Sequence, residues 1–293
     1  MNIVVTLNYN DIENTQHFVE KIKNYKYIDK IIIVDNNSTD NSKDILSKMS
    51  SRIQNDKIEI LYNDNNFGYA SGNNMALKYA NEKYNVKNFI ISNPDIEISE
   101  ESFSKIINKL NQKKYAAVSG LVLNPDNSIP RNFSWKLPKY RDILIETFIT
   151  TTLLFQKLGI SRFYNQDITE KYKSVEVLSG CFFAIDASVF EQIGFFDEST
   201  FLYYEENNIF SSLHKLGYAS TVVTNAPLVH YGGTSTKKNI NSYFKMQKIY
   251  SNSEKKYLIN YLRVNRLQLA LYSFLFNIGK FEKYTILKLF GRI

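Results

Sequence analysis

Four short segments of the sequence are rich in asparagine and aspartate, and these residues are the first candidates for chemistry. They occupy residues 8–11, 35–40, 63–68 and 93–95. Their amide and carboxylate groups offer hydrogen-bond donors and acceptors to a polar ligand. Each segment alone is equally typical of a turn or a helix N-cap, because Asn, Asp and Gly favour both. Four such segments at one sheet edge would favour a ligand-binding role over a purely structural one.

The elements that must position these segments are short β-branched strands alternating with amphipathic helices. Strands are predicted at residues 3–7, 31–34, 58–62, 89–92 and 116–123. Two intervening helices carry apolar residues at helical spacing that we expect to be buried: Phe18, Val19, Ile22, Phe103, Ile106, Ile107 and Leu110. The alternation predicts an α/β fold with a mostly parallel sheet. Ligands bind such sheets at the carboxyl ends of the strands, where the polar segments begin.

The second half has fewer regular patterns. Residues 124–175 contain three prolines and the single tryptophan, and no element is assigned to them. A helix is predicted from Glu205 to Gly217, between strands at 174–185 and 218–223. The apolar residues of this helix that we expect to be buried are Ile209, Leu213 and Leu216.

Composition narrows the class of protein. The 293 residues are 44% hydrophobic and 22% charged, as in ordinary globular proteins. The single Cys181 cannot form an internal disulfide, and the N-terminus has no signal-peptide pattern, so we expect a cytoplasmic protein. The net charge of +7 is uneven, because residues 237–293 contribute twelve Lys and Arg against two Glu, or +10, and the rest −3. The basic character therefore belongs to the tail.

Two common nucleotide motifs are absent from the sequence. There is neither a G-x-x-x-x-G-K-[ST] phosphate loop nor a G-x-G-x-x-G turn after the first strand. Instead, five segments resemble the inverting glycosyltransferases of family 2, which have the GT-A fold. They are residues 5–10 (VTLNYN), 34–40 (VDNNSTD), 66–74 (NFGYASGNN), 93–95 (NPD) and 194–206 (GFFDESTFLYYEE).

The resemblance implies a division of the chain. Residues 1–235 form a GT-A catalytic domain, in which 1–123 bind the nucleotide sugar and 124–235 bind the acceptor. Residues 236–293 form a basic helical C-terminal extension. The implied donor is a nucleotide-diphosphate sugar.

The resemblance also implies which residues bind the donor. Asp35 accepts a hydrogen bond from a pyrimidine base, and Thr6, Asn8 and Tyr9 line the same pocket. A carboxylate suits the imide N–H of uracil or thymine. The alternative for Asp35 is an Asx-turn or a cap.

Three more residues, Asn66, Gly68 and Asn73, fall where the family approaches the ribose and diphosphate. Gly68 would permit close backbone approach to the donor.

The NPD segment occupies the position of the family's Asp-x-Asp motif. The resemblance implies that Asp95 binds Mg²⁺ or Mn²⁺, which offsets charge on the diphosphate. Asn93 replaces the first aspartate and is neutral, so we expect it to contact the ribose and the metal to be held weakly. His230 lies where the family often has a histidine near the metal, although a lone histidine is equally a structural residue. An ordinary turn is the alternative for the whole segment.

Inverting transfer requires a base that takes the proton of the acceptor hydroxyl. The resemblance assigns this role to Glu206, where the family usually has aspartate. The alternative is an acidic helix start favoured by the helix dipole. Asn208 replaces a further aspartate of the pattern, which leaves the surroundings of the base undetermined.

The basic tail has two interpretations. Leu262, Leu269 and Phe276 recur every seven residues, with Lys and Arg around them, so the tail can lie on an anionic membrane and bring the site to a lipid-linked acceptor. Equally, it can pack against the catalytic domain or a second subunit in a homo-oligomer.

Three functions follow from these patterns. The first is a glycosyltransferase, most like bacterial rhamnosyltransferases of surface polysaccharide, using dTDP-rhamnose or a UDP-sugar on a saccharide or lipid-linked acceptor. The second is a catalytically degenerate relative that only binds nucleotide sugar. The third, nucleic-acid binding through the tail, is not favoured, because it leaves the polar sheet edge without a purpose.

Overall fold

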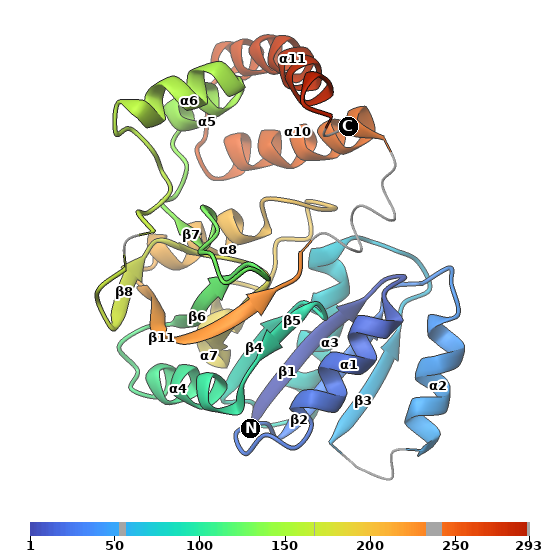
Figure 1. Ribbon diagram of the computed structural model, residues 1–293. Helices are drawn as coiled ribbons and strands as arrows, with labels where there is room; N and C mark the ends of the chain where they lie inside the picture. Colours follow the sequence, from blue (N-terminus) through green and yellow to red (C-terminus); the bar gives the residue numbers. More distant parts are fainter. Residues whose placement is uncertain (53–56, 167, 233–241, 292–293) are drawn as a thin grey trace.

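The computed structural model describes residues 1–52, 57–166, 168–232 and 242–291, and it has two layers (Figure 1). The lower layer is a nine-stranded sheet with helices on both faces. The upper layer consists of helices from the middle and the end of the chain. The predicted domain boundary at residue 235 lies outside the described residues.

Residues 1–123, the predicted donor-binding half, contain the parallel part of the sheet. Its strands, in spatial order, are β3 (Ile58–Tyr62), β2 (Lys30–Asp35), β1 (Asn2–Asn8) and β4 (Asn88–Ser92). Helices α1 (Ile12–Ile22), α2 (Ser42–Arg52) and α3 (Tyr69–Lys83) connect them. Asn8 is paired in register with Asp35. The predicted strands and the parallel sheet are confirmed, and the polar segments meet at one edge.

The rest of the sheet interleaves two distant parts of the chain. Beyond β4 follow β10 (Phe182–Asp186), β6 (Ala117–Leu123), β11 (Ser220–His230) and β5 (Ile96–Ile98), while β8 (Tyr172–Val175) pairs with β11. A small sheet pairs β7 (Ser134–Trp135) with β9 (Val177–Leu178). Helices α4 (Glu100–Leu110), α7 (Ala187–Gln192) and α8 (Glu205–Lys215) complete this layer.

Three details of the second half differ from the predictions. The strand expected at 174–185 is divided among β8, β9 and β10, because its parts pair with different partners. The last strand runs to His230, well beyond residue 223. Leu216 is exposed rather than buried, because it lies after the last turn of α8, where Gly217 has a φ of +81°.

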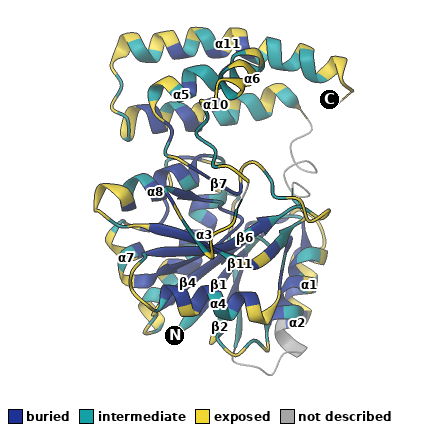
Figure 2. Ribbon diagram, turned by 60° about the vertical axis from the view of Figure 1, so that its left-hand side comes forward, coloured by how far each residue is buried: buried dark blue, intermediate teal, exposed yellow. Residues whose placement is uncertain are grey.

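The apolar core occupies both faces of the sheet (Figure 2). The residues predicted to be buried in α1 and α4 are all in it, as are Ile209 and Leu213 of α8. These helices are amphipathic because their apolar residues recur every three or four positions.

The upper layer is built from α5 (Tyr140–Glu146), α6 (Ile149–Lys157), α10 (Tyr243–Asn260) and α11 (Arg266–Leu289). Its own core contains Ile143, Tyr204, Tyr257, Leu258, Tyr272 and Phe276. Of the three residues that recur at seven-residue intervals, Phe276 belongs to this core, and Leu262 and Leu269 pack against it. This stripe therefore faces the protein interior, as the packing alternative predicted. Among the described residues, no helix is long and apolar enough to cross a membrane.

Candidate active site

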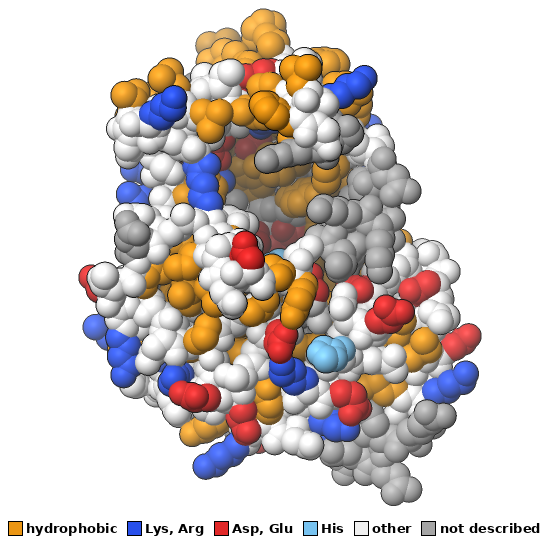
Figure 3. All heavy atoms as spheres, in the orientation of Figure 1, with side chains coloured by type: hydrophobic (Ala, Val, Ile, Leu, Met, Phe, Trp, Pro, Cys, Tyr) orange, Lys and Arg blue, Asp and Glu red, His pale blue; other side chains and the backbone are white. Residues whose placement is uncertain are grey.

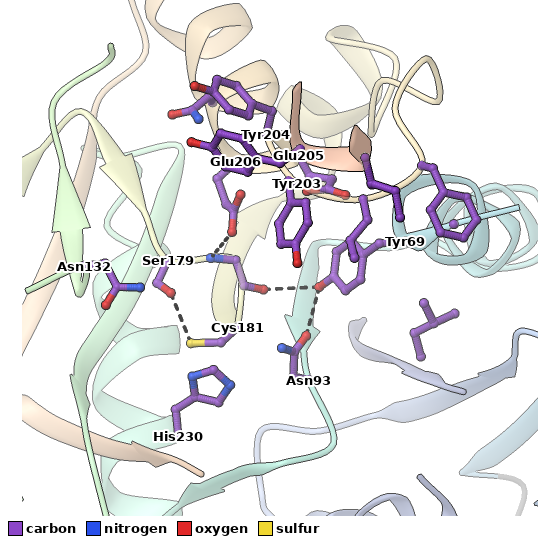
Figure 4. Close-up of a pocket in the computed structure, with 18 of the residues that line it drawn as sticks. Tyr69, Asn93, Asn132, Ser179, Cys181, Tyr203, Tyr204, Glu205, Glu206 and His230 are labelled. Carbon is purple, nitrogen blue, oxygen red and sulfur yellow. Dashed lines mark hydrogen bonds between the residues drawn. The ribbon is translucent and has the colours of Figure 1, made fainter. Parts of the chain in front are cut away.

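A cavity of about 690 Å³ lies between the carboxyl ends of the strands and the helical layer. Figure 3 shows the hollow between the two layers, and Figure 4 shows side chains that line it. The structure places seven of the predicted site residues around this cavity: Tyr9, Asn66, Gly68, Asn93, Asp95, Glu206 and His230.

The remaining predicted donor residues, Thr6, Asn8, Asp35 and Asn73, are buried and are not among the lining residues. Asp35 Oδ1 accepts hydrogen bonds from Asn8 Nδ2 at 2.8 Å and from Ser38 Oγ at 2.6 Å, and Oδ2 accepts one from the Ser38 backbone at 3.1 Å. The Asx-turn alternative is therefore present. The carboxylate has further lone pairs, so its role toward a base stays a prediction.

The other two residues differ in how their polar atoms are used. Asn73 donates to the backbone oxygen of Tyr69 at 2.9 Å, within its own helix. Thr6 Oγ1 is buried without a hydrogen-bond partner. Neither of these two observations points to a ligand by itself.

A network of asparagines, with Asn36 at its centre, forms the donor side of the cavity. Asn36 Nδ2 donates to Asn66 Oδ1 at 2.9 Å and to the Gly68 oxygen at 3.2 Å. Gly68 has a φ of +96°, and a Cβ there would overlap the backbone oxygen of Phe201. The close approach at Gly68 in this structure is thus to the chain itself rather than to a ligand.

Asp95 and His230 face each other across the β5–β11 pair. Asp95 is buried, its Oδ1 accepts no hydrogen bond, and His230 Nε2 lies 3.3 Å from it. Burial alone would lower the pKa of His230, but Asp95 and Cys181 oppose this and raise it to about 10. The Tyr231 backbone N–H donates to the Asp95 backbone oxygen at 3.1 Å, which fixes the loop.

The Asp95 side chain fits a divalent cation in one respect. Its buried Oδ1 accepts no hydrogen bond, although His230 lies 3.3 Å away, and a carboxylate oxygen is the kind of ligand that Mg²⁺ or Mn²⁺ prefers. Within the described ranges, no cluster of three or more His, Cys, Asp or Glu could hold a metal. Asn93 Oδ1 accepts a hydrogen bond from the Tyr69 hydroxyl at 3.2 Å. The protein would thus supply few ligands, and the donor diphosphate and water the others.

Two neighbouring carboxylates, Glu205 and Glu206, line the cavity at the start of α8. Burial, with a contribution from Glu206, raises the pKa of Glu205 to about 8, and burial also raises the pKa of Glu206. Glu206 Oε1 accepts a hydrogen bond from the Gly180 backbone at 3.2 Å. A Cβ on Gly180 would overlap this carboxylate (Figure 4). The absent side chain thus makes room for the Glu206 carboxylate.

The segment before these carboxylates has an unusual backbone. Tyr203 and Tyr204 both have a φ of +73°, a region that large side chains rarely adopt. The helical layer holds them there, because the Tyr204 and Tyr272 hydroxyls both donate to the buried Glu254 of α10, the latter at 2.6 Å. Ser253 Oγ adds a bond to the Leu202 oxygen at 2.7 Å.

Sequence reasoning missed several lining residues. The Tyr69 hydroxyl lies 3.2 Å from both the Gly180 oxygen and Asn93 Oδ1, which share its single proton, and so it joins the two sides of the cavity. Arg162 Nε donates to Glu146 at 2.7 Å, while one of its terminal nitrogens, Nη1, is buried without a partner. Tyr69 lies inside the motif at residues 66–74, so the sequence did offer a signal for it. Arg162 lies in the stretch 124–175, to which no element was assigned, and the sequence offered no signal for it.

The structure also shows the two asparagines that follow Glu206, the predicted base. Asn208 is buried, and neither its side-chain oxygen nor its nitrogen has a hydrogen-bond partner. It therefore does not support Glu206. Asn207 does have a structural role, since its Oδ1 accepts the Trp135 indole N–H at 2.9 Å.

The order of the strands and the helices around them are those of the GT-A fold. A mannosyltransferase from Pyrobaculum calidifontis, solved with GDP-Man and Mn²⁺, has the same fold, with a TM-score of 0.60 at 13% identity over 94% of this chain and 69% of that chain. GalNAc-T7, solved with UDP, GalNAc and Mn²⁺, gives a TM-score of 0.61 at 14% identity over 88% and 48%. The predicted fold is confirmed.

Residues 3–194 match glycosyl transferase family 2, and the chain belongs to this family. A low-salt glycan biosynthesis hexosyltransferase from Haloferax volcanii is 27% identical over 203 residues, 69% of this chain and 58% of that protein. The N-acetylglucosaminyl-diphospho-decaprenol L-rhamnosyltransferase from Mycobacterium tuberculosis is 25% identical over 222 residues, 71% and 68% respectively. The chain thus spans between 58% and 68% of the length of these two curated relatives.

Proposed function

We propose that the protein is an inverting glycosyltransferase that moves a sugar from a nucleotide-diphosphate donor to a hydroxyl of a saccharide or lipid-linked saccharide. The observation that carries the proposal is that Asp95 and Glu206 line one cavity. The first offers a buried carboxylate oxygen that accepts no hydrogen bond and has only the His230 ring beside it, at 3.3 Å, and the second is a carboxylate of raised pKa. These are the two groups that the reaction needs on opposite sides of the anomeric carbon.

In this mechanism, ionised Glu206 takes the proton of the acceptor hydroxyl. The oxygen then attacks the anomeric carbon from the face opposite the nucleoside diphosphate, and the bond to the diphosphate oxygen breaks with its electron pair. A raised pKa makes Glu206 a stronger base than an exposed glutamate. The Gly180 N–H orients its carboxylate.

Asp95 would hold the cation, and bound Mg²⁺ or Mn²⁺ would offset the charge that develops on the leaving diphosphate. His230, which its raised pKa keeps protonated beside Asp95, would have to lose that proton to act as a second ligand. On the donor side, Asp35 would receive the base, with Thr6, Asn8 and Tyr9 around it. Asn66, Gly68, Asn73 and Asn93 would approach the ribose and the phosphates. Each of these assignments rests on the family motif and on the position of the residue at the sheet edge.

The donor that we propose is dTDP-rhamnose or a UDP-sugar, in synthesis of a bacterial surface polysaccharide on the cytoplasmic side. Relatives named as rhamnosyltransferases, one acting on a decaprenol-linked sugar and one on O-antigen from Salmonella anatum, support this choice. A catalytically degenerate, sugar-binding relative is the second candidate, favoured by the neutral Asn93 and the unpartnered Asn208.

The first experiment is thermal shift with UDP-, dTDP- and GDP-sugars, with and without Mn²⁺, followed by transfer assays with the donor that binds. Ligand that binds only the folded state raises the melting temperature. We expect a Mn²⁺-dependent shift with one dTDP- or UDP-sugar. Asp95→Ala should abolish the metal-dependent part, whereas Asp126→Ala, an exposed turn residue outside the cavity lining, should behave as wild type.

The outcomes separate the candidates. A shift together with sugar transfer supports the enzyme. A shift without transfer to any acceptor, including water, favours the binding relative. If no nucleotide sugar shifts the melting temperature at millimolar concentration, the donor assignment is wrong.

A further inference from the structure

Helix α11 carries a second apolar stripe, which points away from the protein. Leu267, Leu271, Phe274, Ile278 and Phe281 recur at intervals of four and three residues and so share one helix face. Their exposed fractions are 82%, 47%, 64%, 47% and 56%. We call these five residues the outer stripe. Contiguous exposed apolar residues of this size mark an interaction surface.

The orientation of the outer stripe is set by the opposite face of the same helix. Tyr272, Phe276 and Gly279 of α11 are buried in the helical layer. A Cβ on Gly279 would overlap the backbone oxygen of Thr147, so the two backbones are in close contact there. Because this face is packed against the protein, the outer stripe must face outward.

Helix α6 extends the same surface. None of its residues is buried, and Leu153, Leu154 and Leu158 are 53%, 55% and 64% exposed. It is joined to α11 by Glu282, which accepts hydrogen bonds from the Ile149 and Thr150 backbones at 2.9 and 3.1 Å. Figure 3 shows apolar side chains gathered over these helices at the end of the molecule farthest from the sheet.

The charges of the described C-terminal helices are mostly positive. Residues 242–291 contain nine Lys and Arg and two Glu, and both carboxylates are in use: Glu254 is buried against two tyrosines, and Glu282 holds the start of α6. Arg266 and Lys288, at the two ends of α11, are exposed. In α5, Glu146 is paired with Arg162. The helix that carries the outer stripe thus has an exposed cation at each end.

We propose that the outer stripe, with the exposed leucines of α6, docks the protein on an anionic lipid bilayer. Apolar residues enter the boundary of the acyl chains while flanking cations contact the phosphate headgroups. A second copy of the chain is a poorer occupant, because it would bring like charges together. The inference goes beyond the proposed chemistry, and it gives a lipid-linked acceptor a reason to meet the cavity, since α10 in the same layer contributes Lys245 and Tyr250 to its lining.

The test is co-sedimentation of the full chain with phosphatidylcholine vesicles with and without about one third phosphatidylglycerol. We expect binding only to the anionic vesicles, and weaker binding at high salt. The double variant Leu271→Ser, Phe274→Ser should lower partitioning at least about tenfold. Arg266→Gln and Lys288→Gln should each lower it about fivefold. The matched control is Leu216→Ser, equally exposed on the other layer, which should bind as wild type.

Two results would overturn the inference. One is equal vesicle binding by wild type and the double variant, with melting temperatures unchanged. The other is no vesicle binding together with a dimer in light scattering that the double variant dissociates, which would make the outer stripe an interface between copies. Glu206→Gln should bind vesicles as wild type, so failure of the catalytic proposal and failure of this inference are separate results.

Discussion

The donor side and the acceptor side of the cavity are held together by different kinds of contact. On the donor side, Asn8 and Asp35 are register partners on adjacent strands, and their side chains are 2.8 Å apart. On the acceptor side, Tyr204 is held by Glu254, 50 residues later in the chain, and Asn207 by Trp135, 72 residues earlier. Sheet pairing positions the first set, and a few buried polar contacts position the second.

This difference has a consequence for substitutions. Backbone hydrogen bonds along four parallel strands hold the donor side, so a single side-chain change there acts locally. The other side depends on a few side-chain contacts, those of Gly180, of Glu254 and of the left-handed Tyr204. A change at one of them should displace the base while leaving the donor site intact.

The largest effect should come from Glu206→Gln. Loss of a general base typically costs about 10²–10⁴ in rate, so kcat for transfer should fall by that factor. Donor binding by thermal shift should stay as in wild type, because the donor contacts are on the other side. A fall of less than tenfold would mean that another residue acts as the base, and Glu205→Gln would be the next variant to assay.

Gly180→Ala should be next in size. The added methyl overlaps the Glu206 carboxylate, which is the mobile end of a side chain, so the carboxylate moves rather than the backbone. A misplacement of about 1 Å costs about 10²-fold in rate. The melting temperature should change little. A large loss of stability with unchanged kcat would contradict the positioning role of this glycine.

Glu254→Gln tests the contact from the helical layer. An amide cannot accept both tyrosine hydroxyls as the carboxylate does, and a buried unsatisfied group costs about 1–3 kcal/mol. We expect the free energy of unfolding to fall by that amount and kcat to fall with it, at unchanged donor affinity. Glu101→Gln, an exposed carboxylate, is the control and should match wild type.

The smallest effect should be in the pH–rate profile. The base acts only when ionised, and burial raises the pKa of Glu206 above its usual 4.5, so activity should fall on acidification at pH values where an exposed glutamate is still ionised. Because the pKa of Glu205 is raised to about 8, Glu205 is neutral while Glu206 titrates, so Glu205→Gln should leave the acid limb at the same pH. A shift of the acid limb to lower pH would mean that Glu205 is ionised in that range and would contradict this order of titration.

The two sides of the cavity also differ in how far the sequence alone could predict them. The donor strands and the burial of Phe18 and Phe103 were predictable because period and propensity are local signals. The meeting of Asp95, Glu206 and His230 followed from the family motifs. Arg162 and Glu254 could not be predicted, because their roles depend on which distant segments pack together. The seven-residue stripe was recognised, but α11 has apolar residues on two faces, and only packing decides which is inside.

The interleaved order of the sheet has a consequence for synthesis of the chain. Strand β11 pairs with β5, and the Tyr231 hydroxyl bonds Glu97 across 134 residues. At about 5–20 residues per second, a ribosome needs roughly 7 to 27 s to make that stretch. Throughout this interval Asp95 lacks His230, and the edge of β4 lacks its neighbour β10 until residue 186 has been made. The nascent chain therefore carries an unpaired sheet edge for much of its synthesis, and the sheet is completed only when the last strand arrives.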